Sequence, residues 1–118
     1  MNQKGLDLIV QHALAGTKQI SYRRDDGQGG HCVLGLFDLG AQKHPGYYFD
    51  QHMAEYGIDL TDTLYQCPVE GCTTVDTERG ILTHLNNSDI ILNNHGFDFL
   101  TIARKWPAKG LQKAPVRS

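Results

Sequence analysis

Apolar residues recur at three- and four-residue intervals in separate parts of the chain, which predicts a mainly α protein. The first part is residues 3–15, where a helix is expected to stop at Gly16. Its periodic apolar residues are Leu6, Ile9, Val10, Ala13 and Leu14. The last part is residues 98–106, with Asp98 as a cap and Pro107 as a stop. Its apolar face consists of Phe99, Ile102, Ala103 and Trp106.

Residues 31–42 are the most apolar stretch, and we predict that they form a buried helix. Gly35 and Gly40 lower the stability of such a helix, so we expect them to allow close approach of a neighbouring helix. Cys32 is expected to be a small buried apolar residue. A further helix is predicted from Tyr47 to Tyr56, with aromatic side chains that serve packing or, alternatively, the stacking of bases.

Length and composition are those of one small globular domain. The chain has 118 residues, of which 40% are hydrophobic and 20% are charged. No apolar run approaches the roughly 18 residues that a membrane helix needs, and no signal peptide is recognisable. We therefore expect a single helical domain over residues 1–106 with an irregular middle, in a bacterial cytoplasm and without membrane contact. Residues 107–118 are expected to form a basic flexible tail.

Charge is unevenly distributed along the chain. Residues 1–103 contain six basic and thirteen acidic residues, a net charge of −7, whereas residues 104–118 contain five basic residues and no acid. Arg104, Lys105 and Lys109 are therefore candidate contacts for phosphates or for an acidic protein. The alternative is that these charges are solvated and favour the negative end of the last helix.

The residues with the clearest candidate chemistry lie in the irregular middle. Cys67 and Cys72 are separated by four residues that include Pro68 and Gly71, which favour a turn. An odd total of three cysteines argues against a disulfide framework. Zn²⁺ prefers four thiolate or imidazole ligands in a tetrahedron, and His84 on a following helix can supply a third. The alternative is that both thiols are free and that His84 is a helix surface residue.

This segment resembles a Cys2His2 zinc finger. The resemblance rests on six positions, which are Tyr65, Cys67, Cys72, Val75, Ile81 and His84. It departs from the pattern because Val75 comes one residue early and because ten residues separate His84 from His95, where a finger has three to five. If His95 is the fourth ligand, residues 86–94 must loop out and return. The other candidates for the fourth ligand are Cys32, His44, His52 and water.

No assembled catalytic set is recognisable. A catalytic zinc needs an open coordination position and a general base, and neither Glu70 nor Glu78 has the spacing of a zinc hydrolase or deaminase. The glycines at 27, 29 and 30 do not fit a nucleotide-binding loop, and nothing around Cys32 or Cys67 marks an activated thiolate. We therefore expect a protein that is not an enzyme and has no evident small-molecule substrate.

Two longer blocks resemble a family of small uncharacterised proteins of tailed bacteriophages and bacteria. The first is residues 30–36, with a Cys-x-Leu-Gly pattern, and the second joins residues 81–87 to residues 95–106. The second block is similar to a His-Leu-Asn-Asp segment followed by His-Gly-Trp and an Ile-Ala-x-Trp helix. This chain has Asn87 in place of an acid, Phe97 in place of tryptophan, and an extra segment at 88–93. The resemblance implies a phage-type accessory protein.

Together these observations favour a small zinc-stabilised binding module that engages a host or phage protein. The alternatives are a nucleic-acid-binding protein of zinc-finger type, or a virion or assembly component. Residues 89–92 form an apolar patch that either packs on the core or contacts a partner. We expect the asparagine pairs 86–87 and 93–94 to cap helices and bind backbone rather than to recognise a ligand.

Overall fold

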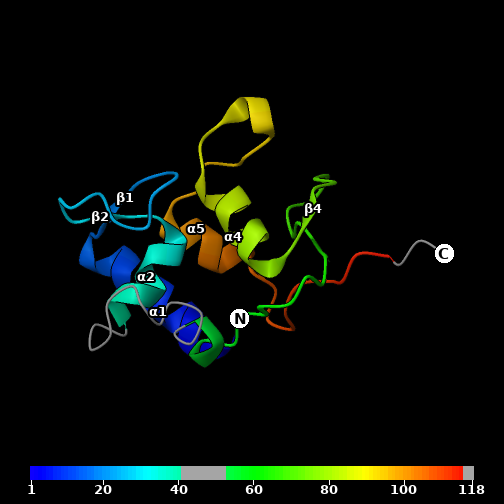
Figure 1. Cartoon of the computed structure of the whole chain (residues 1–118), viewed down its shortest axis with the longest axis horizontal. Coiled ribbons are helices and arrows are strands. Elements are labelled where there is room, and N and C mark those ends of the chain that lie inside the picture. The colour runs from blue at the N-terminus through cyan, green and yellow to red at the C-terminus, as the bar shows by residue number, and fades with distance from the viewer. Residues whose placement is uncertain (41–52, 116–118) are drawn as a thin grey trace.

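The computed structural model describes residues 1–40 and 53–115, and most of its regular structure is helical (Figure 1). Within the described residues, the helices are α1 (Gln3–Ala15), α2 (Val33–Gly40), α4 (Glu78–Asn86), α5 (Phe99–Lys105) and the short 3-10 helix η1 (Ile90–Leu92). Two-residue strands form two small sheets, and these strands are β1 (Lys18–Gln19), β2 (Gly30–His31), β3 (Tyr65–Gln66) and β4 (Val75–Asp76). The predicted mainly α fold is confirmed, with small sheets added to it.

The core forms where α1, α2, α4 and α5 pack against one another (Figure 1). Each helix contributes apolar side chains to one contiguous cluster. The large side chains with no exposed area are Ile9, Val33, Leu36, Phe37, Met53, Ile81, Leu82, Leu85 and Ile102. Full burial of such a side chain contributes roughly 1.5–3 kcal/mol relative to exposure, so this cluster is the main source of stability in the helical part.

The first and last helices begin and end where the sequence predicts. The side chain of Asn2 accepts a hydrogen bond from the Gly5 amide at the start of α1, and Gly16 ends that helix with a left-handed φ of 75°. Asp98 caps α5 by accepting from the Thr101 amide at 2.8 Å. The apolar face of α1 is narrower than predicted, because the Leu14 side chain is 78% exposed.

The buried helix α2 is shorter than predicted, and the role expected of Gly35 was wrong. The predicted span was 31–42, but the helix begins at Val33 because Gly30 and His31 pair with β1. A Cβ atom on Gly35 would lie 2.0 Å from the carbonyl oxygen of Arg24. The glycine therefore admits the backbone of an arginine-bearing loop rather than a neighbouring helix.

The two small sheets organise the irregular parts of the chain. β1 and β2 pair in parallel, and β3 and β4 pair as an antiparallel hairpin. Residues 112–114 of the predicted tail pair with β3 on its other side. The Gln66 amide donates to the Gln112 carbonyl at 2.8 Å, and the Ala114 amide donates to the Leu64 carbonyl at 2.9 Å. This differs from the expectation of a flexible tail beyond residue 107. Residues 112–114 thereby cover the edge of β3 that faces away from β4.

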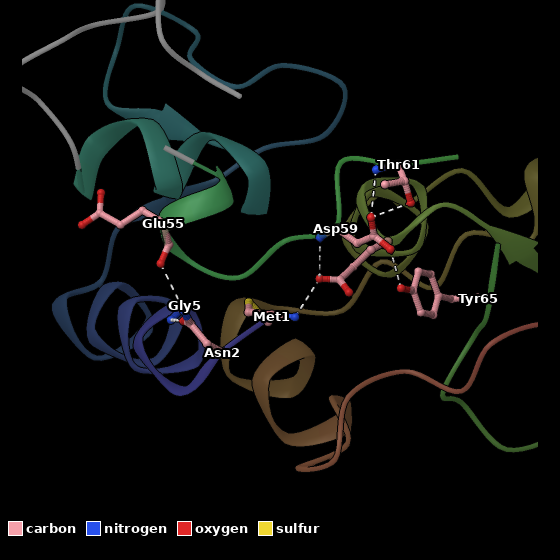
Figure 2. Close-up of polar contacts among 8 residues, drawn as sticks. Met1, Asn2, Gly5, Glu55, Asp59, Thr61 and Tyr65 are labelled. Carbon is pink, nitrogen blue, oxygen red and sulfur yellow. Dashed lines mark hydrogen bonds and ion pairs between the residues drawn. The ribbon is translucent and has the colours of Figure 1, made fainter. Parts of the chain in front are cut away.

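A buried ion pair joins the first residue to α4 (Figure 2). The α-amino group of Met1 lies 2.7 Å from the Glu78 carboxylate, and neither group is more than 6% exposed. The same carboxylate accepts a 3.4 Å hydrogen bond from the Asp59 amide. These contacts satisfy the charge of Glu78 where it is buried, as a buried carboxylate requires.

A second polar cluster holds the segment that leads into β3 (Figure 2). The Tyr65 hydroxyl donates to the Asp59 carboxylate at 2.5 Å, and the amide and hydroxyl of Thr61 donate to the same carboxylate. The bonds from Thr61 and then from Tyr65 lower the pKa of Asp59 to about 2. The bond to Asp59, followed by burial, raises the pKa of Tyr65 from 10.0 to about 12.

We expect Asp59→Asn to return the pKa of Tyr65 toward 10, because the variant removes the carboxylate that disfavours the phenolate. Since the pKa of Tyr65 is raised in the folded chain, its bond stabilises the fold fully below pH 10, and this contribution is lost as the pH rises through about 12. Absorbance of the phenolate during an alkaline titration measures the change. Asp62→Asn, in the same segment, is the control. Equal titration curves for the two variants would contradict the assignment.

Two of the sequence predictions concern residues outside the described part of the chain. The helix predicted from Tyr47 to Tyr56 falls mostly there, and so do His44 and His52. Among the residues that are described, no helix has the length and apolar character needed to cross a bilayer.

Candidate metal centre

Four side chains that can bind a metal ion converge at one end of α4. Cys67 and Cys72 lie in the connection between β3 and β4, His84 lies in the last turn of α4, and His95 follows η1. Their nearest ligand atoms all lie within 4.8 Å of one another. The structure thus brings together all four of the metal-ligating residues that the sequence predicts.

Each of the two thiols lies close to one of the two imidazoles. The Cys67 Sγ atom lies 3.4 Å from His95 Nε2, and the Cys72 Sγ atom lies 3.4 Å from His84 Nε2. The imidazole rings of His84 and His95 meet nearly edge to face, with centroids 4.6 Å apart and an angle of 72° between their planes. Two sulfurs and two nitrogens therefore lie close enough together to bind one ion.

Local backbone structure places both thiols on the same side of the hairpin. The Cys67 amide donates to the Thr74 carbonyl at 2.9 Å, and the Cys72 amide donates to the Val69 carbonyl at 3.0 Å. Gly71 has a φ of 80°, a left-handed conformation that glycine adopts without strain. A tight turn of this kind can present two sulfurs to one ion.

His95 reaches the cluster because the chain leaves α4 and then returns to its last turn. The His95 amide donates to the His84 carbonyl at 3.0 Å, and the Phe97 amide donates to the Leu85 carbonyl at 2.9 Å. The Gly96 amide donates to the Asn87 carbonyl at 2.7 Å. These bonds close a loop over residues 88–94, hereafter the closed loop, as the long spacing between the histidines requires.

No family model matches this chain, and no curated protein or solved structure is significantly similar to it. The case for a metal centre therefore rests on the geometry and chemistry of the four side chains. The resemblance to phage proteins remains a prediction.

Two neighbouring residues, which the sequence did not single out as part of the site, fix the orientations of the imidazoles. The Asn94 side-chain oxygen lies 3.1 Å from His84 Nδ1, so Nδ1–H donates to it and Nε2 faces Cys72. The Phe97 ring stacks on His95 with centroids 5.0 Å apart and planes 10° apart. Such supporting contacts are typical of metal-binding histidines. In the sequence, the position of Asn94 and Phe97 within two residues of His95 is the one feature that could have identified them.

The two thiols differ in acidity because their surroundings differ. Burial raises the pKa of Cys67 to about 11. Burial also opposes ionisation of Cys72, but hydrogen bonds from Thr74 and then from His84 and His95 outweigh it and lower the pKa of Cys72 to about 6. Cys72 is therefore the thiol that loses its proton more readily, and a thiolate is the form that binds metal ions.

The remaining candidate residues lie elsewhere in the fold. Cys32 is buried directly before α2, as predicted for a small apolar residue, and does not belong to the cluster. Arg104 and Lys105 are exposed in the last turn of α5, and Lys109 is exposed beyond it. Positive charges at that end of a helix are favourable, which supports the alternative that these residues are solvated.

Proposed function

We propose that Cys67, Cys72, His84 and His95 bind one structural Zn²⁺ ion. Thiolate and imidazole are the ligands that Zn²⁺ prefers, and two of each form a common structural set. In a tetrahedral site with standard zinc bond lengths, sulfur and nitrogen ligands lie about 3.5 Å apart. The two thiol–imidazole distances of 3.4 Å agree with this value.

The order of elements around the cluster supports a zinc-finger-like interpretation of residues 65–95. A β-hairpin carries the two cysteines and the following helix carries the first histidine, as in a Cys2His2 finger. The second histidine comes from the returning chain rather than from the same helix. Four protein ligands leave no open position for a substrate, so this arrangement favours a structural ion over a catalytic one.

We further propose that the protein is a non-enzymatic binding module that engages another protein through the closed loop. One observation carries this proposal. The side chains of Ile91 and Leu92 are 91% and 63% exposed, so these two side chains do not pack on the core. In Figure 1 the loop, in yellow, projects away from the helices. Exposed neighbouring apolar side chains at the tip of a loop are typical of contacts with a partner.

The closed loop is anchored at its base, which suits a binding role. Backbone bonds from His95, Gly96 and Phe97 join it to α4, and His95 also belongs to the proposed zinc site. A loop with fixed ends loses less conformational entropy on binding than a free one. The resemblance to phage proteins leads us to propose a phage-type accessory protein whose partner is a bacterial host protein or another phage protein.

A capture experiment with matched variants tests the binding proposal. Immobilised protein is incubated with bacterial lysate, and captured proteins are compared between the wild type and Ile91→Ser/Leu92→Ser. The control is Leu14→Ser/Leu64→Ser, which removes two exposed leucines outside the closed loop. We expect a captured protein that the control retains and the loop variant loses, with equal zinc content and melting temperature in all three proteins. Equal capture by both variants would contradict the proposed role of the loop.

A further inference from the structure

A second candidate site lies beside α4, and none of the four residues of the metal cluster lines it. A cavity of about 520 Å³ opens between the loop at residues 22–24, the start of α2 and α4. Side chains from the loop and from α4 line it together, and the polar ones are Arg23, Arg24, Thr77, Arg79, Thr83 and Asn87. None of the described residues that line the cavity is acidic. Cavities of roughly 300–1,000 Å³ are the usual size for small-molecule sites.

The concentration of arginine in this cavity contrasts with the charge of the rest of the chain. Residues 1–103 contain six basic and thirteen acidic residues, yet three of the six basic residues line this cavity. Acidic side chains do occur at its border, since Asp38 lies 3.5 Å from Arg24 and Asp76 packs against Gly80. Asp89 also interacts with the Tyr22 side chain. None of these three carboxylates is among the lining residues of the cavity, whereas all three guanidinium groups are.

The loop that carries two of the arginines is fixed in place although its side chains are exposed. The Tyr22 amide donates to the Asn87 side chain at 3.2 Å, and the Arg23 carbonyl accepts from the Cys32 amide at 3.0 Å. The Arg24 carbonyl accepts from His31 Nδ1 at 2.7 Å. The backbone of each loop residue therefore has a bond to another element.

Tyr22 also has an unfavourable backbone conformation. Its φ is 67°, in the left-handed region that residues other than glycine rarely adopt, and its side chain is 60% exposed. Residues held in such a conformation are concentrated at sites that bind ligands. A strained backbone that holds an exposed aromatic ring beside two arginines is the second observation that points to a ligand.

We propose that this cavity binds the phosphate group of a small phosphorylated molecule of about nucleotide size. Arginine side chains bind phosphate oxygens through paired N–H groups, and the cavity presents three of them from two elements. The hydroxyls of Thr77 and Thr83 are further donors for the same oxygens. Tyr22 at the cavity presents a flat apolar face for the organic part of the ligand.

This site is separate from the proposed zinc site and from the glycine-rich turn. Arg79 and Thr83 are four residues apart and therefore share one face of α4, whereas His84 directs its ring to the cysteines. The glycines at 27 and 29 are not among the cavity's lining residues. The proposal is therefore compatible with the earlier conclusion that these glycines do not form a phosphate-binding loop.

Binding of defined probes tests the proposal with the full zinc-loaded chain. Adenosine 5′-monophosphate, inorganic phosphate and adenosine are titrated separately, and amide NMR shifts report the site. We expect the first two to shift the amides of residues 22–24 and 77–83 saturably, with adenosine much weaker. Arg23→Gln and Arg79→Gln should each weaken phosphate binding by about tenfold, because each removes a charge-assisted hydrogen bond.

Arg104→Gln is the matched control, because it removes the same charge from exposed α5 outside the cavity. It should bind both phosphate probes as the wild type does. Equal weakening by Arg104→Gln would show a nonspecific charge effect and would overturn the proposal. Failure of both phosphate probes to saturate at millimolar concentrations would also overturn it, as would saturable binding of a single-stranded oligonucleotide alone, which would assign the surface to nucleic acid.

Discussion

Cys67→Ala is expected to lose the bound metal ion and to lower the free energy of unfolding by at least about 4 kcal/mol. The reason is that the proposed ion bonds directly to three segments, namely the β3–β4 connection, the end of α4 and the chain at His95. Structural zinc contributes roughly 10–16 kcal/mol to the folding of isolated finger peptides. We expect a smaller effect here because the helical core is buried independently of the metal.

Cys32→Ala provides a closely matched control for this experiment. Both cysteines are buried, with exposures of 8% for Cys32 and 6% for Cys67, but only Cys67 belongs to the cluster. Each variant removes one sulfur atom from a similar environment. The control should keep one metal ion per chain and lose only the packing of its side chain, a cost of about 1–2 kcal/mol.

Elemental analysis and urea unfolding, with and without a chelator, measure the effect. We expect one zinc ion per chain in the wild type, and a lower urea midpoint after chelation. Hydrogen exchange should accelerate at the amides of Cys67, Cys72 and His95, because their bonds lie next to the ion. A wild-type protein that is purified without a chelator and contains no metal, with an unfolding curve that chelator leaves unchanged, would rule out the metal site.

The helices that the sequence predicts best are those with local signals at both ends. The first helix has a periodic apolar face and an αL glycine stop, and the last has an aspartate cap and a proline stop, and both occur nearly as predicted. The start of α2 was not predictable in the same way, because the pairing of Gly30 and His31 with β1 depends on residues more than ten positions away. The pairing of residues 112–114 beside β3 is a nonlocal contact of the same kind.

Three residues of the candidate metal cluster could be predicted from ligand type and spacing, but the participation of the fourth could not. Cys67, Cys72 and His84 follow a local hairpin–helix pattern that the sequence displays directly. Participation of His95 depends on whether the closed loop returns to α4, and that depends on backbone bonds between distant residues. The arginine cavity gave no sequence signal, because Arg79 is more than fifty residues from the other two arginines that line it.

Asn86→Ala is expected to lower the free energy of unfolding by about 3 kcal/mol without loss of the metal ion. The Asn86 side chain is 3% exposed and joins three parts of the fold. Its oxygen accepts from the Val33 amide at 3.0 Å and from Gln19 Nε2 at 2.9 Å, and its nitrogen donates to the Ile20 carbonyl at 2.9 Å. This confirms the prediction that the asparagine pair at the end of α4 binds backbone.

The large expected effect of Asn86→Ala arises because the substitution leaves backbone groups of other segments without their hydrogen-bonding partner. The buried Val33 amide and the part-buried Ile20 carbonyl each lose a hydrogen bond, and a buried group left unpaired costs roughly 1–3 kcal/mol. Asn87→Ala is the graded comparison. Among the described residues, the equally buried Asn87 side chain accepts one backbone hydrogen bond, from the Tyr22 amide at 3.2 Å, so this substitution should cost about 1 kcal/mol. Urea unfolding of both zinc-loaded variants measures the difference. Equal destabilisation by the two substitutions would mean that the Asn86 bonds do not join α4 to α2 and β1 in the way that their geometry indicates.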